Sequence, residues 1–239
     1  MAKKTYRNKG SKENIIISIA GAHGVGKTTI FNLLKKRVSQ NYKFKFFPER
    51  YVKNPPFPFG SKDKQISFRS EIHFLQQFIR RNKNIANFDK NYNGRILILD
   101  RTPICVLVYS KSLNLREKDY NLILDMYDSV EWKEDYIVYL TAKPNTILKR
   151  IVQRGSIDRL RREWNEYERD YLLKVISNYK QIFLSKFDAD RIFIINTDDL
   201  TQEEVLNELE KIITQLSGYT FKKLENPPAT QRSLIDFLT

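Results

Sequence analysis

The sequence predicts an α/β fold in which a parallel sheet of five strands is sandwiched by helices. Five short apolar runs, rich in β-branched and aromatic residues, alternate with segments whose apolar residues have helical spacing. Such runs are typical of strands buried on both faces, and this alternation is typical of parallel sheets. The expected strands are 15–20, 43–47, 95–100, 136–140 and 191–195.

The composition indicates one globular domain of a water-soluble protein. Of the 239 residues, 41% are hydrophobic and 29% are charged. The single cysteine, Cys105, excludes an internal disulfide. No apolar run approaches the roughly 20 residues that a membrane span needs, and the basic N-terminus lacks the apolar segment of a signal peptide. We therefore expect a cytoplasmic protein without a membrane partner.

The chain carries a formal net charge of +14. Such an excess favours polyanionic partners, either nucleic acid or phosphate-rich ligands. The positive residues are spread along the chain, however, so a solvated lysine-rich surface explains them equally well. DNA is therefore a candidate partner that the charge alone does not establish.

The segments between the strands predict helices and set the limits of the domain. The first helix follows the first strand, and the last begins at TQEE, residues 201–204, which has the spacing of a capping box. Gly218 is a suitable stop for this last helix, and Pro227 and Pro228 prevent a continuation. We expect a disordered basic arm over 1–13, one domain over 14–217, a linker over 218–230 and a separate peptide over 231–239.

The segment GAHGVGKTT, residues 21–29, follows the first strand and opens the first helix. It matches G-x-x-x-x-G-K-[ST], the P-loop of nucleoside triphosphate-binding proteins, in which backbone N–H groups surround the phosphates. We expect Lys27 to reach the outer phosphates and assist catalysis, and Thr28 to hold Mg²⁺. His23 is either a phosphate contact or a loop side chain without a role. The residues expected to bind ATP are Gly21, Gly24, Gly26, Lys27, Thr28 and Thr29.

Asp100 and Arg101 end the third apolar run, RILILD followed by R. A carboxylate at the end of a buried strand beside a P-loop is placed to order the water shell of Mg²⁺. The adjacent Arg101 is placed to reach a phosphate or a substrate hydroxyl. The sequence thus predicts a P-loop NTPase with a magnesium site at Thr28 and Asp100.

The order of these motifs resembles the deoxynucleoside kinase and thymidylate kinase group. Members have a P-loop, an acidic residue after the second strand, an Asp-Arg or Glu-Arg pair after the third and an arginine-rich mobile lid after the fourth. Here FFPERY contains Glu49, LDRTP contains the Asp-Arg pair, and LTAKPNTILKRIVQRG contains Arg150 and Arg154. RDYLLKVISNYKQIF resembles the helix that follows the lid. The resemblance covers about residues 14–217.

The resemblance implies that Glu49 is the general base for a nucleoside 5′-hydroxyl and that Arg101 orients this hydroxyl. It implies that Arg150 and Arg154 neutralise charge in the transition state. A surface ion pair between Glu49 and Arg50 is the structural alternative. The chain departs from the family in two places, since Pro48 precedes Glu49 and Ser156 replaces a third lid arginine.

The family also reads the base with a glutamine on the helix before the third strand. The candidates in FRSEIHFLQQFIRR are Glu71, Gln76 and Gln77, and the sequence does not choose among them. Base specificity is therefore left open.

The C-terminal segment QRSLIDFLT, residues 231–239, resembles the PCNA-interacting peptide (PIP box) that binds the sliding clamp. Gln231, Leu234, Phe237 and Leu238 occupy its defining positions. The last three are at i, i+3 and i+4, so one helical turn would present them to a single pocket. The alternative is a tail that packs on its own domain or on a dimer partner.

These observations leave three functions open. The first is ATP- and Mg²⁺-dependent phosphoryl transfer to a deoxynucleoside or a nucleoside monophosphate by a kinase tethered to PCNA. The second is a polynucleotide kinase that phosphorylates a 5′-hydroxyl end of DNA or RNA during repair. The third is a non-kinase ATPase that acts as an accessory factor of the clamp.

Overall fold

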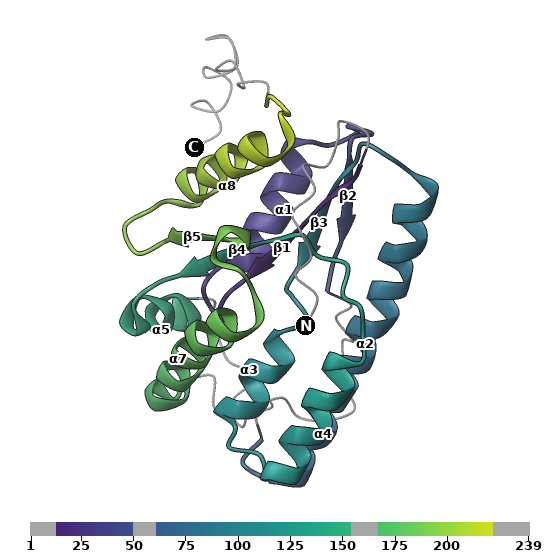
Figure 1. The fold of residues 1–239 in the computed structure, drawn as a ribbon. Helices are drawn as coiled ribbons and strands as arrows, with labels where there is room; N and C mark the ends of the chain where they lie inside the picture. Colours follow the sequence, from purple (N-terminus) through teal and green to yellow (C-terminus); the bar gives the residue numbers. More distant parts are fainter. Residues whose placement is uncertain (1–12, 50–60, 154–166, 222–239) are drawn as a thin grey trace, which may run out of the picture.

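A five-stranded sheet with the strand order β2-β3-β1-β4-β5 forms the centre of the molecule (Figure 1). The computed structural model describes residues 13–49, 61–153 and 167–221. All neighbouring strands are parallel, and Ile17 of the central strand pairs with Ile98 on one side and Tyr136 on the other. The strands are β1 (Ile15–Ala20), β2 (Phe44–Phe47), β3 (Ile96–Asp100), β4 (Tyr136–Thr141) and β5 (Ile192–Asn196).

The sheet is buried on both faces because its central strands are apolar at almost every position. On β3, Ile96 and Ile98 join the main hydrophobic core, whereas Leu97 and Leu99 join a second cluster with Ile85 of α2. Alternate side chains of a strand point to opposite faces, so these two clusters lie on the two sides of the sheet. This confirms the predicted fold class, and each expected strand matches an observed one to within one residue at either end.

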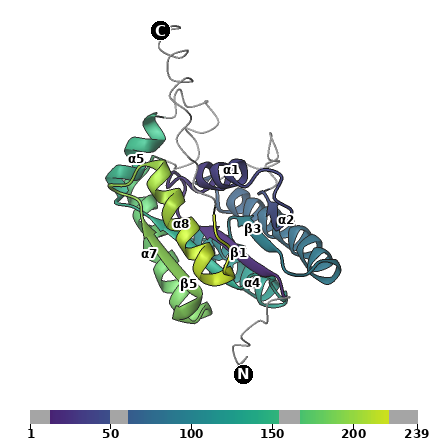
Figure 2. The ribbon, with the colours of Figure 1, turned by 90° about the horizontal axis from the view of Figure 1, so that it is seen from above.

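Helices flank the sheet on both sides. Helices α1 and α8 contact each other, whereas α3 contacts α2, α4 and α7. Seen from above, α2 and α7 lie at opposite sides of the molecule (Figure 2). The helices are α1 (Lys27–Arg37), α2 (Lys64–Asn91), α3 (Cys105–Ser112), α4 (Glu117–Asp128), α5 (Pro144–Gln153), α7 (Arg169–Lys186) and α8 (Gln202–Ser217), with a 3₁₀ turn η1 (Ala189–Arg191).

The last helix has the ends that the sequence predicts. The Thr201 hydroxyl accepts a hydrogen bond from the Glu204 N–H, and the Glu204 carboxylate accepts one from the Thr201 N–H at 2.7 Å. Gly218 ends the helix with φ 68°, a left-handed conformation that glycine adopts without strain.

The packed chain continues beyond Ser217. The rings of Tyr219 and Phe221 lie 5.0 and 5.9 Å from the ring of Phe44, and the Asn41 amide donates a hydrogen bond to the Tyr219 hydroxyl. These contacts fix the start of the segment that we expected to be a linker. The N-terminal arm up to residue 12, residues 222–230 and the peptide 231–239, which was predicted to bind PCNA, lie outside the described residues.

Within the described ranges, no helix combines the length and the apolar character that crossing a membrane requires.

Candidate active site

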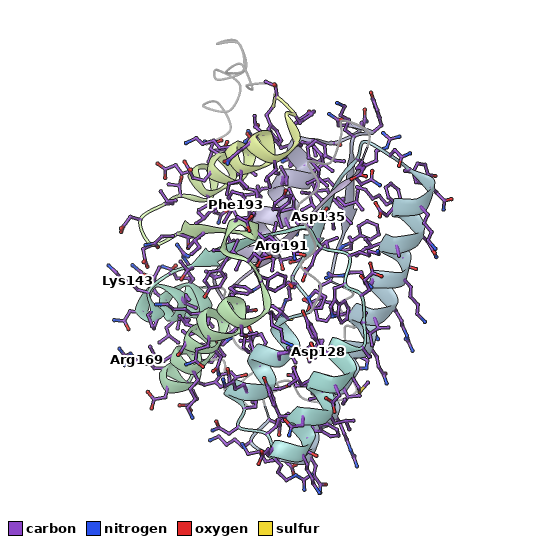
Figure 3. The ribbon with its side chains drawn as sticks, in the orientation of Figure 1. Asp128, Asp135, Lys143, Arg169, Arg191 and Phe193 are labelled. Carbon is purple, nitrogen blue, oxygen red and sulfur yellow. The ribbon has the colours of Figure 1, made fainter. Side chains whose placement is uncertain are left out.

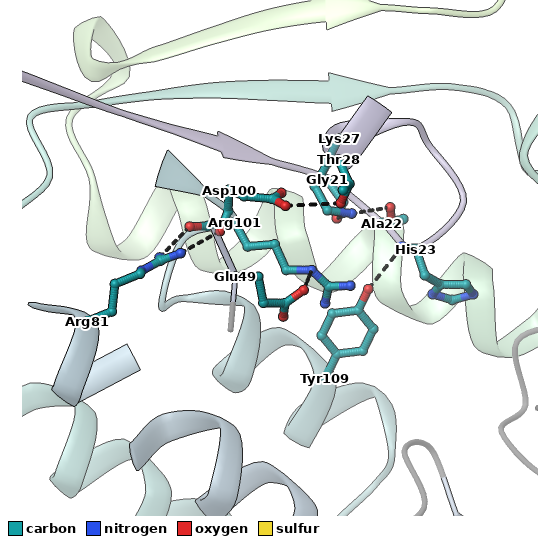
Figure 4. Close-up of polar contacts among 10 residues, drawn as sticks. All are labelled: Gly21, Ala22, His23, Lys27, Thr28, Glu49, Arg81, Asp100, Arg101 and Tyr109. Carbon is teal, nitrogen blue, oxygen red and sulfur yellow. Dashed lines mark hydrogen bonds and ion pairs between the residues drawn. The ribbon is translucent and has the colours of Figure 1, made fainter. Parts of the chain in front are cut away.

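The predicted site residues meet at the carboxyl edge of the sheet. The P-loop follows β1, Glu49 follows β2, and Asp100 ends β3. Because all strands are parallel, their carboxyl ends lie at one edge, where ligands of open α/β sheets bind. Figure 4 shows these side chains converging on one region.

The P-loop depends on glycine where the backbone bends most. Gly21 has φ 144°, and a Cβ at this position would lie 2.4 Å from the carbonyl oxygen of Leu140. Gly24 has φ 78°, and its Cβ would lie 2.6 Å from the side chain of Ile151 in α5. Larger residues would therefore displace β4 or α5, so these glycines allow the loop to sit close to its neighbours.

Lys27 is folded back into this loop. Its ammonium group donates hydrogen bonds to the carbonyl oxygens of Gly21 at 2.8 Å and Ala22 at 2.7 Å. Burial, together with the positive charge of Arg101, lowers the pKa of Lys27 to about 7, although Asp100 and Glu49 act in the opposite direction. An anion beside Lys27 would favour its protonated form, as expected for a phosphate-binding lysine.

Thr28 and Asp100, which were predicted to hold Mg²⁺, lie next to each other. The Thr28 hydroxyl donates a hydrogen bond of 3.1 Å to Asp100 Oδ2. Asp100 is buried, and its Oδ1 atom has no hydrogen-bond partner among the described residues. No group of three acidic, histidine or cysteine residues forms a metal centre in the part of the chain that the structure describes. The pair suits Mg²⁺, which binds proteins through one or two oxygen ligands and completes its shell with phosphates and water.

Glu49 and Arg101 form an ion pair across the ends of β2 and β3. Glu49 Oε2 lies 2.9 Å from Arg101 Nε, and both side chains are largely buried. Burial lowers the pKa of Arg101, but the Glu49 carboxylate and the smaller effects of Tyr109, Cys105 and Tyr179 together outweigh it, so the net pKa is raised and the guanidinium stays charged. Glu49 thus pairs with Arg101, while Arg50, the partner in the structural alternative, lies outside the described residues.

Arg150 is not part of this group. Its guanidinium donates hydrogen bonds to the hydroxyl oxygen of Thr197 at 2.8 Å and to the carbonyl oxygen of the same residue at 2.5 Å. Thr197 follows β5, which is three strand spacings from β3, or about 14 Å at roughly 4.8 Å per spacing. The structure therefore separates Arg150 from the Glu49–Arg101 pair. Arg154 lies outside the described residues.

A second group of polar side chains is buried between α2, α3 and α7. Glu71 is 1% exposed, and its Oε1 atom has no hydrogen-bond partner in the described ranges. Burial raises the pKa of Glu71 well above its usual value, and Arg101 only partly opposes this effect. Unpaired buried polar atoms are rare and suggest a polar ligand. Ser70, Ser110, Tyr167 and Tyr171 also carry buried side-chain oxygens without a hydrogen-bond partner among the described residues, and Tyr171 interacts electrostatically with Glu71.

The structure distinguishes among the three candidates for reading the base. Glu71 is buried, Gln76 is exposed, and Gln77 is partly exposed. Gln77 lines a pocket beside Glu49 together with Phe74, Phe78 and Arg81. Glu71 is therefore the candidate on the interior face of α2.

His23 connects the P-loop to two helices. Its backbone N–H donates a hydrogen bond of 3.0 Å to the Tyr109 hydroxyl of α3. Its ring stacks on Tyr171 of α7, with centroids 5.8 Å apart. His23 is buried, so its side chain packs within the protein, a role that the loop motif did not indicate.

The sequence model of the deoxynucleoside kinase family matches residues 17–219. The deoxyadenosine/deoxycytidine kinase of Bacillus subtilis is 25% identical over 212 residues, which cover 86% of this chain and 93% of that enzyme. The thymidylate kinase of Mycoplasma mobile is 24% identical over 217 residues, which cover 83% of this chain and 99% of that enzyme.

Solved structures share the fold. Deoxyadenosine kinase from M. mycoides with bound dATP superimposes with a TM-score of 0.64 and 23% identity, over 84% of this chain and 100% of that one. The same enzyme with the products dCMP and a flexible dCDP also gives a TM-score of 0.64, with 21% identity over 83% and 98% of the two chains. Because the family model spans most of the chain, this protein belongs to the deoxynucleoside kinase family of phosphotransferases.

Proposed function

We propose that the protein transfers the terminal phosphoryl group of ATP to the 5′-hydroxyl of a deoxynucleoside, with Glu49 as the general base. The Glu49–Arg101 ion pair carries this proposal, because it lies at the same edge of the sheet as Lys27 and the Thr28–Asp100 pair. One carboxylate and two cations are thus available where a hydroxyl and a phosphate would meet.

The residues have complementary roles in this reaction. Glu49 accepts the proton of the 5′-hydroxyl while the hydroxyl oxygen attacks the terminal phosphorus of ATP, and ADP leaves. Arg101 holds the Glu49 carboxylate and faces the transferred group, and Lys27 stabilises the negative charge of the phosphates. Thr28 and Asp100 would hold Mg²⁺, which neutralises phosphate charge when it is bound.

We propose that the acceptor carries adenine or cytosine. A protonated carboxyl at Glu71 has one donor and one acceptor, the pattern that matches the ring nitrogen and amino group of these bases. The raised pKa of Glu71 favours this protonated form. A relative named for deoxyadenosine and deoxycytidine supports the same choice. A nucleoside monophosphate stays the second candidate acceptor, since another relative is named thymidylate kinase.

The two arginines expected in the lid differ in what they can do in this reaction. We propose that Arg154 neutralises negative charge in the transition state. Arg150 can contribute only after it releases Thr197, because its present contacts hold it at the end of β5.

Tethering to PCNA is proposed on the sequence of the tail alone. Gln231, Leu234, Phe237 and Leu238 have the spacing of the clamp-binding motif. Such a short segment gains its helical turn on binding, so the tail would act independently of catalysis.

A phosphate-transfer screen tests the acceptor. Labelled ATP and Mg²⁺ are incubated with each deoxynucleoside, each deoxynucleoside monophosphate and a 5′-hydroxyl oligonucleotide, with Lys27→Ala as the negative control. Label on deoxyadenosine or deoxycytidine is the expected result. Label on the oligonucleotide alone would replace this proposal with an end kinase, and label on no acceptor would favour an ATPase.

A further inference from the structure

Arg81 of α2 forms hydrogen bonds to the backbone of two site residues, Asp100 and Arg101. One terminal nitrogen of its guanidinium donates a hydrogen bond to the carbonyl oxygen of Asp100 at 2.5 Å, and the other donates to that of Arg101 at 2.7 Å (Figure 4). Arg81 is 5% exposed, and its guanidinium lies 4.8 Å from the ring of Phe78. The contact is therefore a buried, two-pronged clamp on consecutive peptide groups.

The clamped segment has an unfavourable backbone conformation. Arg101 has φ 66°, in the left-handed region that is unfavourable for a bulky residue. This turn directs the Asp100 side chain to Thr28 and the Arg101 side chain to Glu49. It also directs the two carbonyl groups toward α2, where buried acceptors need donors. Arg81 supplies those donors and so opposes relaxation of the turn.

A buried carboxylate close to Arg81 supports the same segment. Glu134, just before β4, accepts hydrogen bonds from the Thr102 hydroxyl at 2.9 Å and from the Ser18 hydroxyl at 2.6 Å. Its negative charge also interacts with the Arg81 guanidinium. The chain from Asp100 to Thr102 is thus held by α2 and by the residue that precedes Asp135 and β4.

We propose that Arg81 is a positioning residue for phosphoryl transfer, acting by fixing the Asp100–Arg101 turn. This inference rests on the proposed function. A positioning role differs from a purely structural role in one measurable way. A structural arginine would lower stability when it is replaced, whereas a positioning arginine would lower turnover in protein that is still folded.

Arg191 provides a matched control. Its Nε donates to the carbonyl oxygen of Asp135 at 2.7 Å, and a terminal nitrogen donates to that of Glu134 at 2.5 Å. Figure 3 labels Arg191 and Asp135, which lie near each other. Its guanidinium also lies against an aromatic ring, that of Phe187, at 5.3 Å. Arg191 thus makes the same kind of clamp, but before β4 and not at the Asp100–Arg101 turn.

The test compares Arg81→Met, Arg81→Lys and Arg191→Met by steady-state kinetics well below their melting temperatures. A displacement of about 1 Å at a reacting group can cost about 100-fold in rate, so Arg81→Met should lower kcat by about that factor. The KM for ATP should change less than kcat, because Lys27 and the P-loop are untouched, although Asp100 is also proposed to hold Mg²⁺. Arg81→Lys should recover part of the turnover, and Arg191→Met, which keeps the direct contacts of Arg81 with the Asp100–Arg101 turn, should lower kcat much less than Arg81→Met does.

Chemical rescue adds a readout that lost stability does not produce. In Arg81→Ala, millimolar ethylguanidine should raise kcat several-fold by occupying the vacated space, and it should not raise that of the wild type or of Arg191→Met. Unchanged kcat in folded Arg81→Met would overturn the inference. So would equal losses in Arg81→Met and Arg191→Met, or no rescue. A wild-type protein without transfer to any deoxynucleoside would instead overturn the proposed function.

Discussion

The ammonium group of Lys27 lies 2.7 Å from the carbonyl oxygen of Ala22, so the P-loop lysine is hydrogen-bonded to its own loop. A ligand that binds there must compete with these carbonyls for the ammonium group. The same side chain is partly deprotonated near neutral pH, because burial and Arg101 lower its pKa to about 7. ATP binding and the protonation of Lys27 are therefore expected to be coupled.

ATP binding at pH 8 should take up close to one proton. Most Lys27 side chains are neutral at this pH in the free protein, and negative phosphates raise the pKa so that the bound lysine is charged. The dissociation constant for ATP should therefore rise as pH rises above 7. Calorimetry in two buffers of different ionisation enthalpy measures the uptake. Lys27→Arg is the control, since it keeps the charge without titrating. Equal uptake in Lys27→Arg would exclude Lys27 as the group.

Glu49→Gln should lower turnover by about 100-fold to 10,000-fold, because the amide does not accept the proton of the hydroxyl. ATP affinity should stay close to that of the wild type, since Glu49 faces Arg101 and not the P-loop. Single-turnover transfer and ATP titration give the two quantities separately. Unchanged turnover would remove Glu49 as the base.

Glu71→Ala should raise the KM for deoxyadenosine or deoxycytidine by about 5-fold to 150-fold, the equivalent of about 1–3 kcal/mol for a lost buried partner. Glu71→Gln should retain most affinity, because the amide keeps one donor and one acceptor. The wild-type KM should rise at high pH as the raised pKa is passed and the donor is lost. The KM of Glu71→Gln should stay flat over that range. The opposite pattern, a pH-dependent Gln variant, would contradict the assignment.

Catalysis and clamp binding should be separable. Lys27→Ala should abolish phosphoryl transfer and leave PCNA affinity unchanged, whereas Phe237→Ala should do the reverse. Transfer assays and calorimetry with purified PCNA measure the two properties. Loss of both properties in either variant would show that the tail and the site are not independent.

A chain that ends at Ser217 should be less stable than one that ends at Phe221. The truncation removes the aromatic contacts of Tyr219 and Phe221 with Phe44, worth about 0.5–1.5 kcal/mol each in addition to the buried area. The melting temperature should fall by about 2–4 °C for each kcal/mol lost. Equal melting temperatures would mean that the domain is complete at Ser217.

The sequence specified the sheet well because its strands are buried on both faces. Runs such as Ile15–Ala20 and Ile96–Asp100 have few other interpretations, and the P-loop motif fixes the order of strand, loop and helix. The Thr201 capping box and the Gly218 stop depend only on residues close in the sequence, so both predictions are confirmed in the structure.

The contacts between residues far apart in the sequence were harder to predict from the sequence. Glu49 has Arg50 as its neighbour in sequence, yet its observed partner is Arg101 from another strand. Arg81 bonds to backbone carbonyls, which have no residue-specific signature at all. A buried Glu71 and an exposed Gln76 are both polar residues on one helix, and only packing against α3 and α7 distinguishes them.

Phe221 lies against Phe44, the first residue of β2, whereas the proposed catalytic groups lie at or after the last residues of the strands. The described chain therefore stops at the amino edge of the sheet, opposite the carboxyl edge where a nucleoside would bind. A fluorescent protein or a surface anchor fused directly after Phe221 would leave the candidate site unobstructed. The same geometry would let an enzyme held at Phe221 release its product freely into the surrounding solution.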